Sequence, residues 1–448
     1  MPATAGFLWR TDIVHSTNNR ILPSASLSWF VWSLGAAFFL LAFFHRVAPA
    51  VLHRELSQDF GLSAAALGGL SGLYFYSYVA MQVPTGLLVD RWGPRWLLVG
   101  GLFLSAIGAV VFATAATLFW AGAGRFLIGG SVAVAFVSAL KLATHWLPAQ
   151  RYALATGLLL VVGMTGAVFG GVPLQFASNV FGWRAVVIAT AGVALMLALL
   201  VWLVVRDDPS DKGYRGYIPV ADAGDAQTGE GDRLRAVLRY RNTWLLALAP
   251  GGIVGSVLAF AGLWGMPFLT DVYQLTPVAA ASVCSGMMLC WAFSGPLFGM
   301  ASEKLRRRRA PYAAGNFVAL LAWALVVLVP DLPVWALVSA LMLAGLSSGG
   351  MILGFAQAKE SVPLRLAGTV SGLVNMGVMC GPMLLQPLVG WVLDWFWQGN
   401  VGADGLRVYL FESYRIGFLM LLLWLVVSVV CVLASHETRC RQSPGDRA

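Results

Sequence analysis

Two basic residues stand inside apolar runs, where a polypeptide rarely keeps a charge. Arg46 follows His45 in the run 29–52, and Arg125 lies in another run, within GRFLIGG. Burying a guanidinium group in hydrocarbon is costly, so such a residue is usually retained for function. Its planar set of donors matches the two oxygens of a carboxylate. We therefore predict that Arg46 faces an internal cavity and binds an anion.

Further polar side chains are candidates for the same cavity. Tyr74, Tyr78 and Gln82 are spaced i, i+4 and i+8, so they share one face of a helix. We predict hydroxyl and amide contacts from them beside Arg46; ordinary packing between helices is the alternative. Lys141, in ALKLATHWLP, is a second candidate cation. Its long stem would also let the ammonium group reach the headgroup region.

The second half of the chain contributes three candidates. Trp264 stands in AFAGLWGMPFL, where two glycines and a proline interrupt a helix, and helix breaks commonly line binding sites in membranes. We predict that Trp264 faces the cavity. Asn375 and Gln386 are polar groups within one apolar run. They are predicted to face inward, either as substrate contacts or as hydrogen bonds between helices.

The elements that position these residues must be membrane-spanning helices. The 448 residues are 59% hydrophobic and 11% charged, a balance typical of a polytopic membrane protein. Apolar runs long enough to cross a hydrocarbon layer of about 30 Å recur along the chain. Twelve spans are predicted, at 28–52, 63–89, 96–116, 118–144, 152–176, 184–205, 243–270, 278–301, 310–330, 333–356, 367–393 and 414–435. The predicted fold is therefore an all-α membrane protein of two six-helix bundles.

A polar segment divides these spans equally. Residues 206–242 are rich in Asp, Gly, Lys and Arg and predict a flexible cytoplasmic linker. The predicted organisation is a cytoplasmic tail (1–27), a first bundle (28–205), the linker (206–242), a second bundle (243–435) and a cytoplasmic tail (436–448). The first tail lacks the apolar core and cleavage site of a signal peptide.

Charge placement predicts the orientation. With the amino terminus in the cytoplasm, Lys and Arg concentrate on the inner side, and only Arg54, Arg184, Arg407 and Arg415 fall on the outer side. This distribution follows the positive-inside rule. The net charge of +9 then reflects topology and contact with anionic lipid, and no nucleic-acid partner is predicted. We expect a multi-pass protein of the cell membrane, the inner membrane in bacteria, with both termini cytoplasmic.

The sequence offers no pattern for catalysis or metal binding. The five cysteines lie in spans or in the last tail without metal-type spacing or outer-side pairs, so neither disulfides nor a metal site is predicted. No nucleophile-base pair or phosphate loop stands out. We therefore expect neither an enzyme nor a cofactor.

Similar signals recur in the two halves. GLLVDRWGPR, 86–95, follows the second span, and GMASEKLRRR, 299–308, follows the eighth. Likewise a proline and two glycines around the fifth span, Pro148, Gly157 and Gly166, correspond to Pro363, Gly372 and Gly381 around the eleventh. Such matches indicate an internal repeat.

Twelve spans, two repeats and this loop motif together resemble the major facilitator superfamily, whose bundles rock about a midplane cavity while the motif locks the cytoplasmic side. The resemblance implies gating roles for the motif residues Gly86, Asp90, Arg91, Gly93, Arg95, Gly299, Glu303 and Lys304. We expect Gly86 to permit close helix approach and Asp90 to bond a helix terminus or a basic residue. Anchoring of the loop to the headgroups is the alternative.

The stretch from His45 to Arg95 resembles the anion:cation symporter branch of that family, which handles organic anions such as sugar acids. In that branch an Asp-Arg pair occupies the first span and a glutamate follows the fourth-span arginine; here His45 and Val132 replace the two acids. The resemblance links Arg125 to proton movement or to cavity structure. No Asp or Glu remains well inside a predicted span, so His45 is the remaining titratable candidate for proton coupling. Sodium, a counter-anion or no coupling are the alternatives.

The sequence thus predicts a monomeric secondary transporter that takes up a small carboxylate, with a proton as the expected coupling ion. An exporter of drugs or metabolites, an amino-acid or small-peptide carrier and a non-transporting membrane receptor are the alternatives. Nitrate or nitrite carriers are a neighbouring possibility, but they resemble one another through Asn-Gly-rich fifth and eleventh spans and paired arginines in the second and eighth spans, which this chain lacks.

Overall fold

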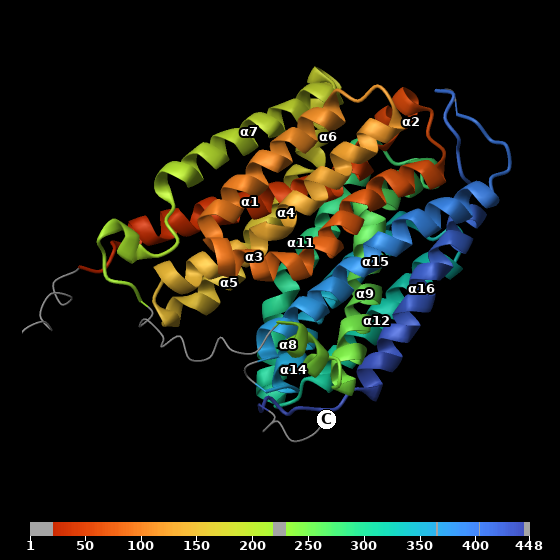
Figure 1. The fold of residues 1–448 in the computed structure, drawn as a ribbon. Helices are drawn as coiled ribbons and strands as arrows, with labels where there is room; N and C mark the ends of the chain where they lie inside the picture. Colours follow the sequence, from red (N-terminus) through yellow and green to blue (C-terminus); the bar gives the residue numbers. More distant parts are fainter. Residues whose placement is uncertain (1–20, 218–229, 364–365, 403, 443–448) are drawn as a thin grey trace, which may run out of the picture.

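The computed structural model describes residues 21–217, 230–363, 366–402 and 404–442. This part of the chain is built from helices, with a single isolated β-bridge between Val401 and Arg407. The helices run in two groups, one formed by the first half of the chain and one by the second (Figure 1), and the groups meet where α3 (Ala64–Ala113) packs against α15 (Ala367–Trp395).

Seven α-helices make up the first group. They are α1 (Ala25–Val51), α2 (His53–Phe60), α3 (Ala64–Ala113), α4 (Leu118–Trp146), α5 (Tyr152–Phe169), α6 (Val172–Phe181) and α7 (Trp183–Val204), with a short 3-10 turn, η1 (Ala149–Arg151), before α5. Two predicted spans are merged in α3, which is broken at Gly93, where φ is 77°. The fifth span is divided into α5 and α6.

Two short helices, η2 (Pro209–Lys212) and α8 (Glu230–Val237), come before the second group. The second group consists of α9 (Arg241–Ala259), the π-helical turn η4 (Phe260–Trp264), α10 (Gly265–Asp271), α11 (Pro277–Leu305), α12 (Arg309–Leu328), α13 (Val334–Ser348), α14 (Met351–Glu360), α15 (Ala367–Trp395) and α16 (Phe411–Ala434).

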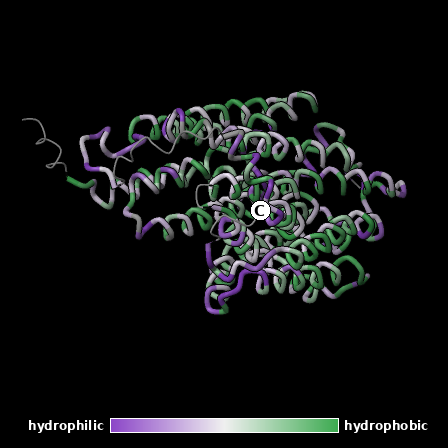
Figure 2. The backbone as a smooth tube through the Cα atoms, turned by 60° about the horizontal axis from the view of Figure 1, so that its bottom comes forward, coloured by the Kyte–Doolittle hydropathy of each residue, from purple (hydrophilic) through white to green (hydrophobic). Residues whose placement is uncertain are grey.

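The helices are long and apolar enough to cross a membrane. Eleven candidate spans occur in the described residues, and the first part of α3 makes the predicted twelfth crossing. Hydrophilic residues gather at the helix ends and in the loops (Figure 2). The predicted all-α membrane fold is therefore confirmed, with boundaries that differ from the predicted ones by a few residues.

Glycines bring corresponding helices together in both groups. At Gly166 of α5, an added Cβ would collide with the Leu40 carbonyl of α1. At Gly381 of α15, it would collide with the Gly251 carbonyl of α9. Small residues allow such close backbone approach in lipid. The repeat predicted from the pairing of Gly166 with Gly381 thus has a counterpart in packing.

The segment predicted as a flexible linker is ordered where it leaves the first group. Asp208 caps η2 through a reciprocal pair of hydrogen bonds with Asp211 and Ser210, and the backbone carbonyl of Arg206 accepts a hydrogen bond from the Trp146 indole, 2.9 Å away. Residues 218–229, also predicted as linker, lie outside the described residues. These contacts attach the first residues of the segment to helix ends, and the flexibility of the linker stays a prediction.

Candidate functional site

Arg46 lies in α1, and only 1% of its surface is exposed. Its guanidinium carbon is 4.2 Å from the centre of the Phe43 ring, 5.2 Å from that of Tyr78 and 5.9 Å from that of Tyr74. Aromatic faces attract a cation, but they do not satisfy its N–H groups. Nε and Nη2 of Arg46 have no hydrogen-bond partner among the described residues. The predicted burial of Arg46 is confirmed, and two of its donors are available.

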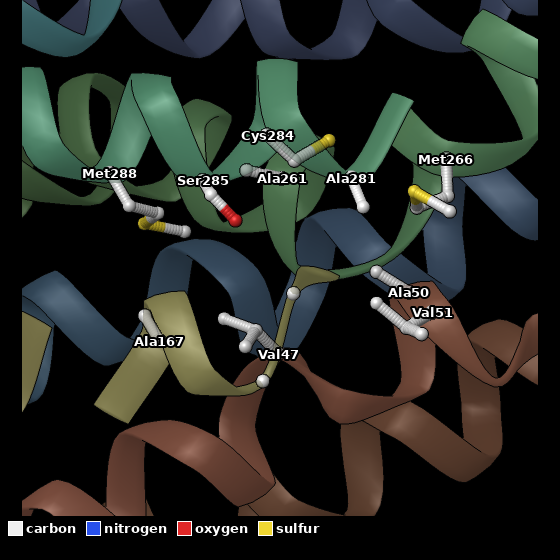
Figure 3. A pocket seen from close by; sticks show the side chains of 12 residues that line it. Val47, Ala50, Val51, Ala167, Ala261, Met266, Ala281, Cys284, Ser285 and Met288 are labelled. Atoms are coloured by element: carbon white, nitrogen blue, oxygen red, sulfur yellow. The ribbon is translucent and has the colours of Figure 1, made fainter. Parts of the chain in front are cut away.

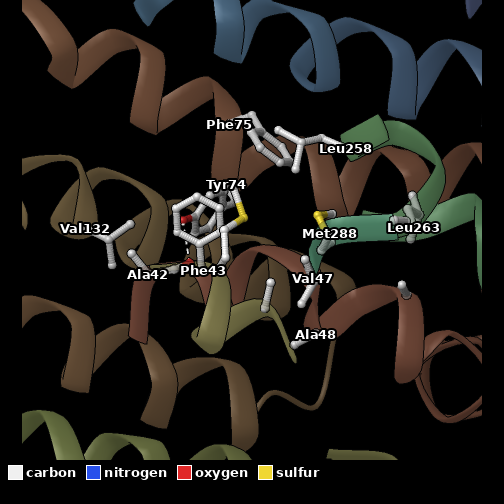
Figure 4. Close-up of a cluster of buried hydrophobic side chains, with 14 of the residues drawn as sticks. Ala42, Phe43, Val47, Ala48, Tyr74, Phe75, Val132, Leu258, Leu263 and Met288 are labelled. Carbon is white, nitrogen blue, oxygen red and sulfur yellow. Dashed lines mark hydrogen bonds between the residues drawn. The ribbon is translucent and has the colours of Figure 1, made fainter. Parts of the chain in front are cut away.

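Tyr74 lies close to both Arg46 and Arg125. The Tyr74 hydroxyl donates to the carbonyl of Ala42, 2.9 Å away, which holds α3 against α1 (Figure 4). The Arg125 guanidinium carbon is 5.0 Å from the centre of the Tyr74 ring. Gly129, one turn further along α4, would collide with the Tyr74 carbonyl if it carried a Cβ. The glycines of GRFLIGG therefore bring α4 close enough to α3 to set Arg125 beside Tyr74.

Arg125 is attached to the backbone beside Arg46. Its Nη1 donates to the carbonyl of His45, 2.7 Å away, while its Nε and Nη2 are buried without a partner in the described part of the chain. His45 is also buried, and its ring nitrogen Nε2 is likewise unpaired there. The structure thus brings together His45 and Arg46 of the first predicted span and Arg125 of the fourth.

The predicted face of α3 forms one continuous surface. The rings of Tyr74 and Tyr78 are stacked, with 6.2 Å between their centres. Gln82 lies two turns beyond Tyr74 and accepts a hydrogen bond from Asn375 of α15, 2.6 Å away. Gln82 and Asn375 therefore join the two halves of the protein. Their contact with each other fits the alternative of hydrogen bonding between helices.

Trp264 and Gln386 form a second link, within the other half. The Trp264 indole donates to the Gln386 carbonyl at 2.9 Å, and the Gln386 amide donates to the Leu258 carbonyl at 3.0 Å. The predicted helix break is observed as the π-helical turn η4. A Cβ on Gly262 in this turn would lie 3.3 Å from Gln386 Nε2 and 3.9 Å from the carbonyl oxygen of Arg46. Gln386 therefore lies close to the α1 backbone at Arg46, and its Oε1 is unpaired in the described residues.

Lys141 is not part of this group of contacts. Its ammonium group donates to the carbonyl of Val89, 3.1 Å away, at the end of the first part of α3. Lys141 therefore lies beside the loop motif. We call the side of the protein that carries the loop motif the inner side, in keeping with the predicted orientation.

The loop motif is held by a residue that the sequence did not single out. Asp207, just after α7, accepts a hydrogen bond of 2.7 Å from the backbone N–H of Arg95, and the Arg95 side chain donates to the Trp202 carbonyl at 2.8 Å. A Cβ on Gly93 would collide with the Asp207 carboxylate. Gly93 is thus required both by its positive φ and by this contact.

Other parts of the gating prediction have different outcomes. A Cβ on Gly86 or on Gly299 would meet nothing within 4 Å, so the expected close helix approach at Gly86 is wrong in this conformation. Arg91 is exposed, as are Glu303 and Lys304. The side chain of Asp90 lies outside the described part of the structure.

The second half has an equivalent of the Asp207 contact. Glu437, just after α16, accepts hydrogen bonds of 2.8 and 2.9 Å from the backbone N–H groups of Arg308 and Arg309 at the start of α12. Arg308 also pairs with Glu360 at the end of α14, at 2.8 Å. In each half, therefore, an acidic residue after the last helix caps the start of the bundle's third span. We call these two contacts the inner caps.

A second residue after α7 supports the first inner cap. His145 Nδ1, at the end of α4, lies 3.0 Å from the carboxylate of Asp208. Burial raises the pKa of Asp208, but hydrogen bonds from His145 and Ser210 outweigh that effect and lower the pKa below its ordinary value. Asp208 is thus a carboxylate at neutral pH.

The opposite, outer side is closed by contacts between the halves. Asp394 of α15 accepts hydrogen bonds from the backbone N–H groups of Ala64 and Ala65 at the start of α3, at 3.1 and 2.8 Å, and from the Tyr409 hydroxyl at 2.7 Å. Arg407 pairs with the same carboxylate at 3.1 Å. We call this contact the outer latch. The sequence predicted Asp394 only as a charge at a helix end.

Beside the latch lies a cavity of about 330 Å³, lined from both halves by residues such as His53, Arg54, Asp271 and Arg407. Trp264 also lines this cavity, so its predicted exposure to a cavity applies to the outer side. Burial lowers the pKa of His53 to about 4, despite a hydrogen bond to the Ala50 carbonyl that raises it. His53 is therefore neutral at physiological pH.

The halves are packed tightly between the outer latch and Arg46. Val47, Ala50 and Val51 of α1 face Ala281, Cys284, Ser285 and Met288 of α11 (Figure 3), and the gap between them holds only about 10 Å³. A Cβ on Gly171 would collide with the hydroxyl of Ser285. We call this packed surface the outer seam.

Comparison with known proteins identifies the fold. The sequence model of the Major Facilitator Superfamily matches residues 31–376 and again residues 254–446. The chain belongs to the Major Facilitator Superfamily. It is therefore a multi-pass membrane transporter and not an enzyme, and the resemblance seen in the sequence is confirmed.

Individual relatives extend over most of the chain. The probable galactarate/D-glucarate transporter GudP of Bacillus subtilis (strain 168) is 23% identical and covers 88% of this chain and 92% of its own length. The probable nitrate/nitrite transporter NarK2 of Mycobacterium tuberculosis (strain ATCC 25618 / H37Rv) is 26% identical and covers 72% of this chain and 78% of its own length. Both names describe transporters of anions.

A solved structure shares the fold. A bacterial homolog of the human lysosomal transporter Spinster, in an inward-facing and unoccupied conformation, superposes with a TM-score of 0.75 at 21% identity, and covers 94% of this chain and 100% of that one. The agreement concerns the fold and extends over both halves.

Proposed function

We propose that this protein is a secondary active transporter of a small organic anion, a carboxylate, and that Arg46 binds the anion between the two halves. The observation that carries the proposal is the buried guanidinium group of Arg46, which keeps two donor nitrogens, Nε and Nη2, without a partner among the described residues. Leaving charged donors unsatisfied in a protein interior is unfavourable. A carboxylate that accepts from them would relieve this cost.

The surroundings of Arg46 suit alternating access. The guanidinium group belongs to α1 of the first half, and Gly262 of the second half approaches the Arg46 backbone. An anion bound here would therefore contact both halves, and their relative movement would expose it to one side at a time. We propose roles in binding for Tyr74, Tyr78 and Gln386, and a role in joining the halves for Gln82 and Asn375.

The relatives support an anion as cargo. The names of GudP and NarK2 refer to sugar diacids and to nitrate or nitrite. Both are oxyanions that a guanidinium group can bind through two parallel hydrogen bonds. Nitrate is therefore the second candidate cargo, favoured by the similarity to NarK2.

We also propose that the direction is uptake, that the protein is a monomer in the bacterial inner membrane, and that both termini are cytoplasmic, with an inner side marked by the inner caps. The coupling ion predicted from the sequence is a proton, with His45 and Arg125 as candidates. A counter-anion is the alternative developed below.

Transport by purified protein in liposomes tests this function. We expect uptake of at least one labelled anion from a panel of D-glucarate, succinate, lactate and nitrate, and a thermal shift by the same anion, because a ligand that binds only the folded form raises its stability. Resistance to added drugs without anion transport would favour an exporter. Transport of amino acids or peptides would favour that carrier class, and binding without counterflow would favour a receptor.

A further inference from the structure

Two permanent positive charges lie close to one aromatic ring, that of Tyr74. The guanidinium carbons of Arg46 and Arg125 are 5.9 and 5.0 Å from the centre of the Tyr74 ring. Both side chains are 1% exposed. Each keeps Nε and Nη2 buried without a hydrogen-bond partner in the described residues, so four donor atoms carry positive charge and have no acceptor there.

No buried acid balances these charges. Among the residues that the structure describes, the buried polar side chains include the two arginines but no aspartate or glutamate. Asp271 and Asp394 contact Arg54 and Arg407 at the outer ends of their helices. The rings of Phe43 and Tyr78 lie close to the Arg46 charge, and the His45 carbonyl accepts a hydrogen bond from Arg125. These neighbours stabilise the charges only in part. Charges held in an apolar interior without a counter-charge are strongly unfavourable.

An anion that accepts from the unpaired donors of both guanidinium groups would supply the missing counter-charge. When the halves rock with the site empty, both cations must pass through the closed state without compensation. When the site is loaded, the anion neutralises them during the same movement. The loaded carrier should therefore cross much more readily than the empty one, since a bound ligand lowers the free energy of the states that it fits.

We propose that the protein is an obligatory anion exchanger, which returns across the membrane only with a second anion in the Arg46–Arg125 site. The inference rests on the proposed function and specifies the ion to which transport is coupled. It replaces the proton as the driving partner, because the described site has no carboxylate to carry one. A proton on His45 would add a third positive charge next to the two guanidinium groups, so the same field opposes it.

Counterflow in proteoliposomes tests the proposal with the intact chain. Vesicles are loaded with unlabelled D-glucarate, succinate, lactate or nitrate, or with an uncharged sugar, and the labelled form of the same anion is added outside. We expect uptake at least about tenfold faster with the anion inside than with the sugar, and no change when a proton gradient is imposed or collapsed.

Two results contradict the proposal in different ways. Fast uptake into anion-free vesicles that follows an inward proton gradient would overturn exchange and leave anion transport intact. No uptake of any of the four anions under either condition would contradict the proposed function as well.

A designed acid provides a second, independent readout. Val132 is buried in α4 and lies in the same cluster as Ala42, Phe43 and Tyr74 (Figure 4). V132E would place a carboxylate in this cluster, seven residues along α4 from Arg125, whereas V132Q has a similar size without the charge. We expect V132E to lose most of the requirement for an internal anion and V132Q to retain it. The measurement is the ratio of uptake into anion-loaded vesicles to uptake into anion-free vesicles. If this ratio were equal for wild type, V132E and V132Q, the absence of an acid would not be what imposes exchange.

Discussion

The Tyr74 ring lies close to two cations and attracts both. Its hydroxyl donates a hydrogen bond to the Ala42 carbonyl, and its aromatic face is available to the guanidinium groups. A buried cation over an aromatic face gains about 2 kcal/mol, and here two guanidinium groups share one ring. Tyr74 is therefore expected to be as important as the arginines for the integrity of the site.

Two substitutions separate the roles of the ring and the hydroxyl. Y74F removes the hydroxyl with its hydrogen bond to Ala42 and should cost about 1 kcal/mol of stability. Y74L also removes the ring close to Arg46 and Arg125 and should cost about 2 kcal/mol more. Thermal unfolding of the three proteins measures both effects. If Y74L were as stable as Y74F, the ring would not be holding the two cations.

The sequence was sufficient to predict some residues of the site and not others. Arg46 and Arg125 stand out because a charge inside an apolar run has few explanations. The sequence does not single out the three acids Asp207, Asp394 and Glu437, because a charge at a helix end is equally consistent with a contact with lipid headgroups. Which helix start lies beside each of these acids depends on tertiary packing. For the same reason the sequence could not show that Lys141 donates to the Val89 carbonyl.

The two ends of the first part of α3 are controlled by different partners. At its outer end, the first N–H groups are capped by Asp394 of the other half. At its inner end, the chain turns at Gly93 and starts a new helix under Asp207 of its own half. The outer end must therefore lose its cap when the halves part on that side, whereas the inner end need not.

Weakening the outer latch should favour opening on the outer side. D394N keeps the shape of the side chain but loses the charge that strengthens its hydrogen bonds to Ala64 and Ala65. Cys284, buried in the outer seam, can report the opening once the other cysteines are replaced. We expect an impermeant maleimide to label Cys284 about tenfold faster in D394N, as for a change of about 1.4 kcal/mol. R415A is the control, since Arg415 pairs with Glu412 at the surface. Equal labelling of D394N and R415A would contradict the latch.

The inner caps should depend on pH in a defined direction. Burial raises the pKa of Glu437, but hydrogen bonds from the backbone of Arg308, Arg439 and Arg309 outweigh this and hold the pKa below its ordinary value. A lowered pKa means that the stabilisation is present above the unfolded-state pKa and is lost as the pH falls through the folded-state pKa.

The substitution E437Q tests that dependence. Because Glu437 is partly exposed, we expect a loss of only about 1 kcal/mol at neutral pH. The difference from wild type should disappear at strongly acidic pH, where the wild-type carboxyl is protonated as well. Thermal unfolding across this range is the measurement. A difference that stayed constant down to acidic pH would show that the charge of Glu437 is not what caps α12.

At the scale of the whole molecule, the same design occurs twice. Each half packs its fifth span against its first through a glycine, Gly166 or Gly381, and caps its third span with an acid that follows its sixth. The twelve spans and the repeat could be predicted because a bilayer fixes helix length and because the paired signals recur along the chain. The closed outer side could not, because the sequence is compatible with every state of the transport cycle.

The two halves differ in the residues that they contribute to the proposed site. Arg46 and Arg125 are both in the first half, and the described part of the second half has no buried cation. The second half instead presents Gln386 and the break at Gly262 to the α1 backbone. We infer that the first half holds the anion and that the second half closes over it.

Calorimetric titration of the anion that gives the largest thermal shift, into wild type, R46K, R46A and the surface control R415A, tests this account most directly. Loss of two charge-assisted hydrogen bonds should weaken binding at least about a hundredfold in R46A, which corresponds to about 2.7 kcal/mol. R46K, which keeps the charge without the planar pair of donors, should fall between R46A and wild type. R415A should bind as wild type does. Unchanged affinity in R46A would contradict the assignment of Arg46 as the anion site.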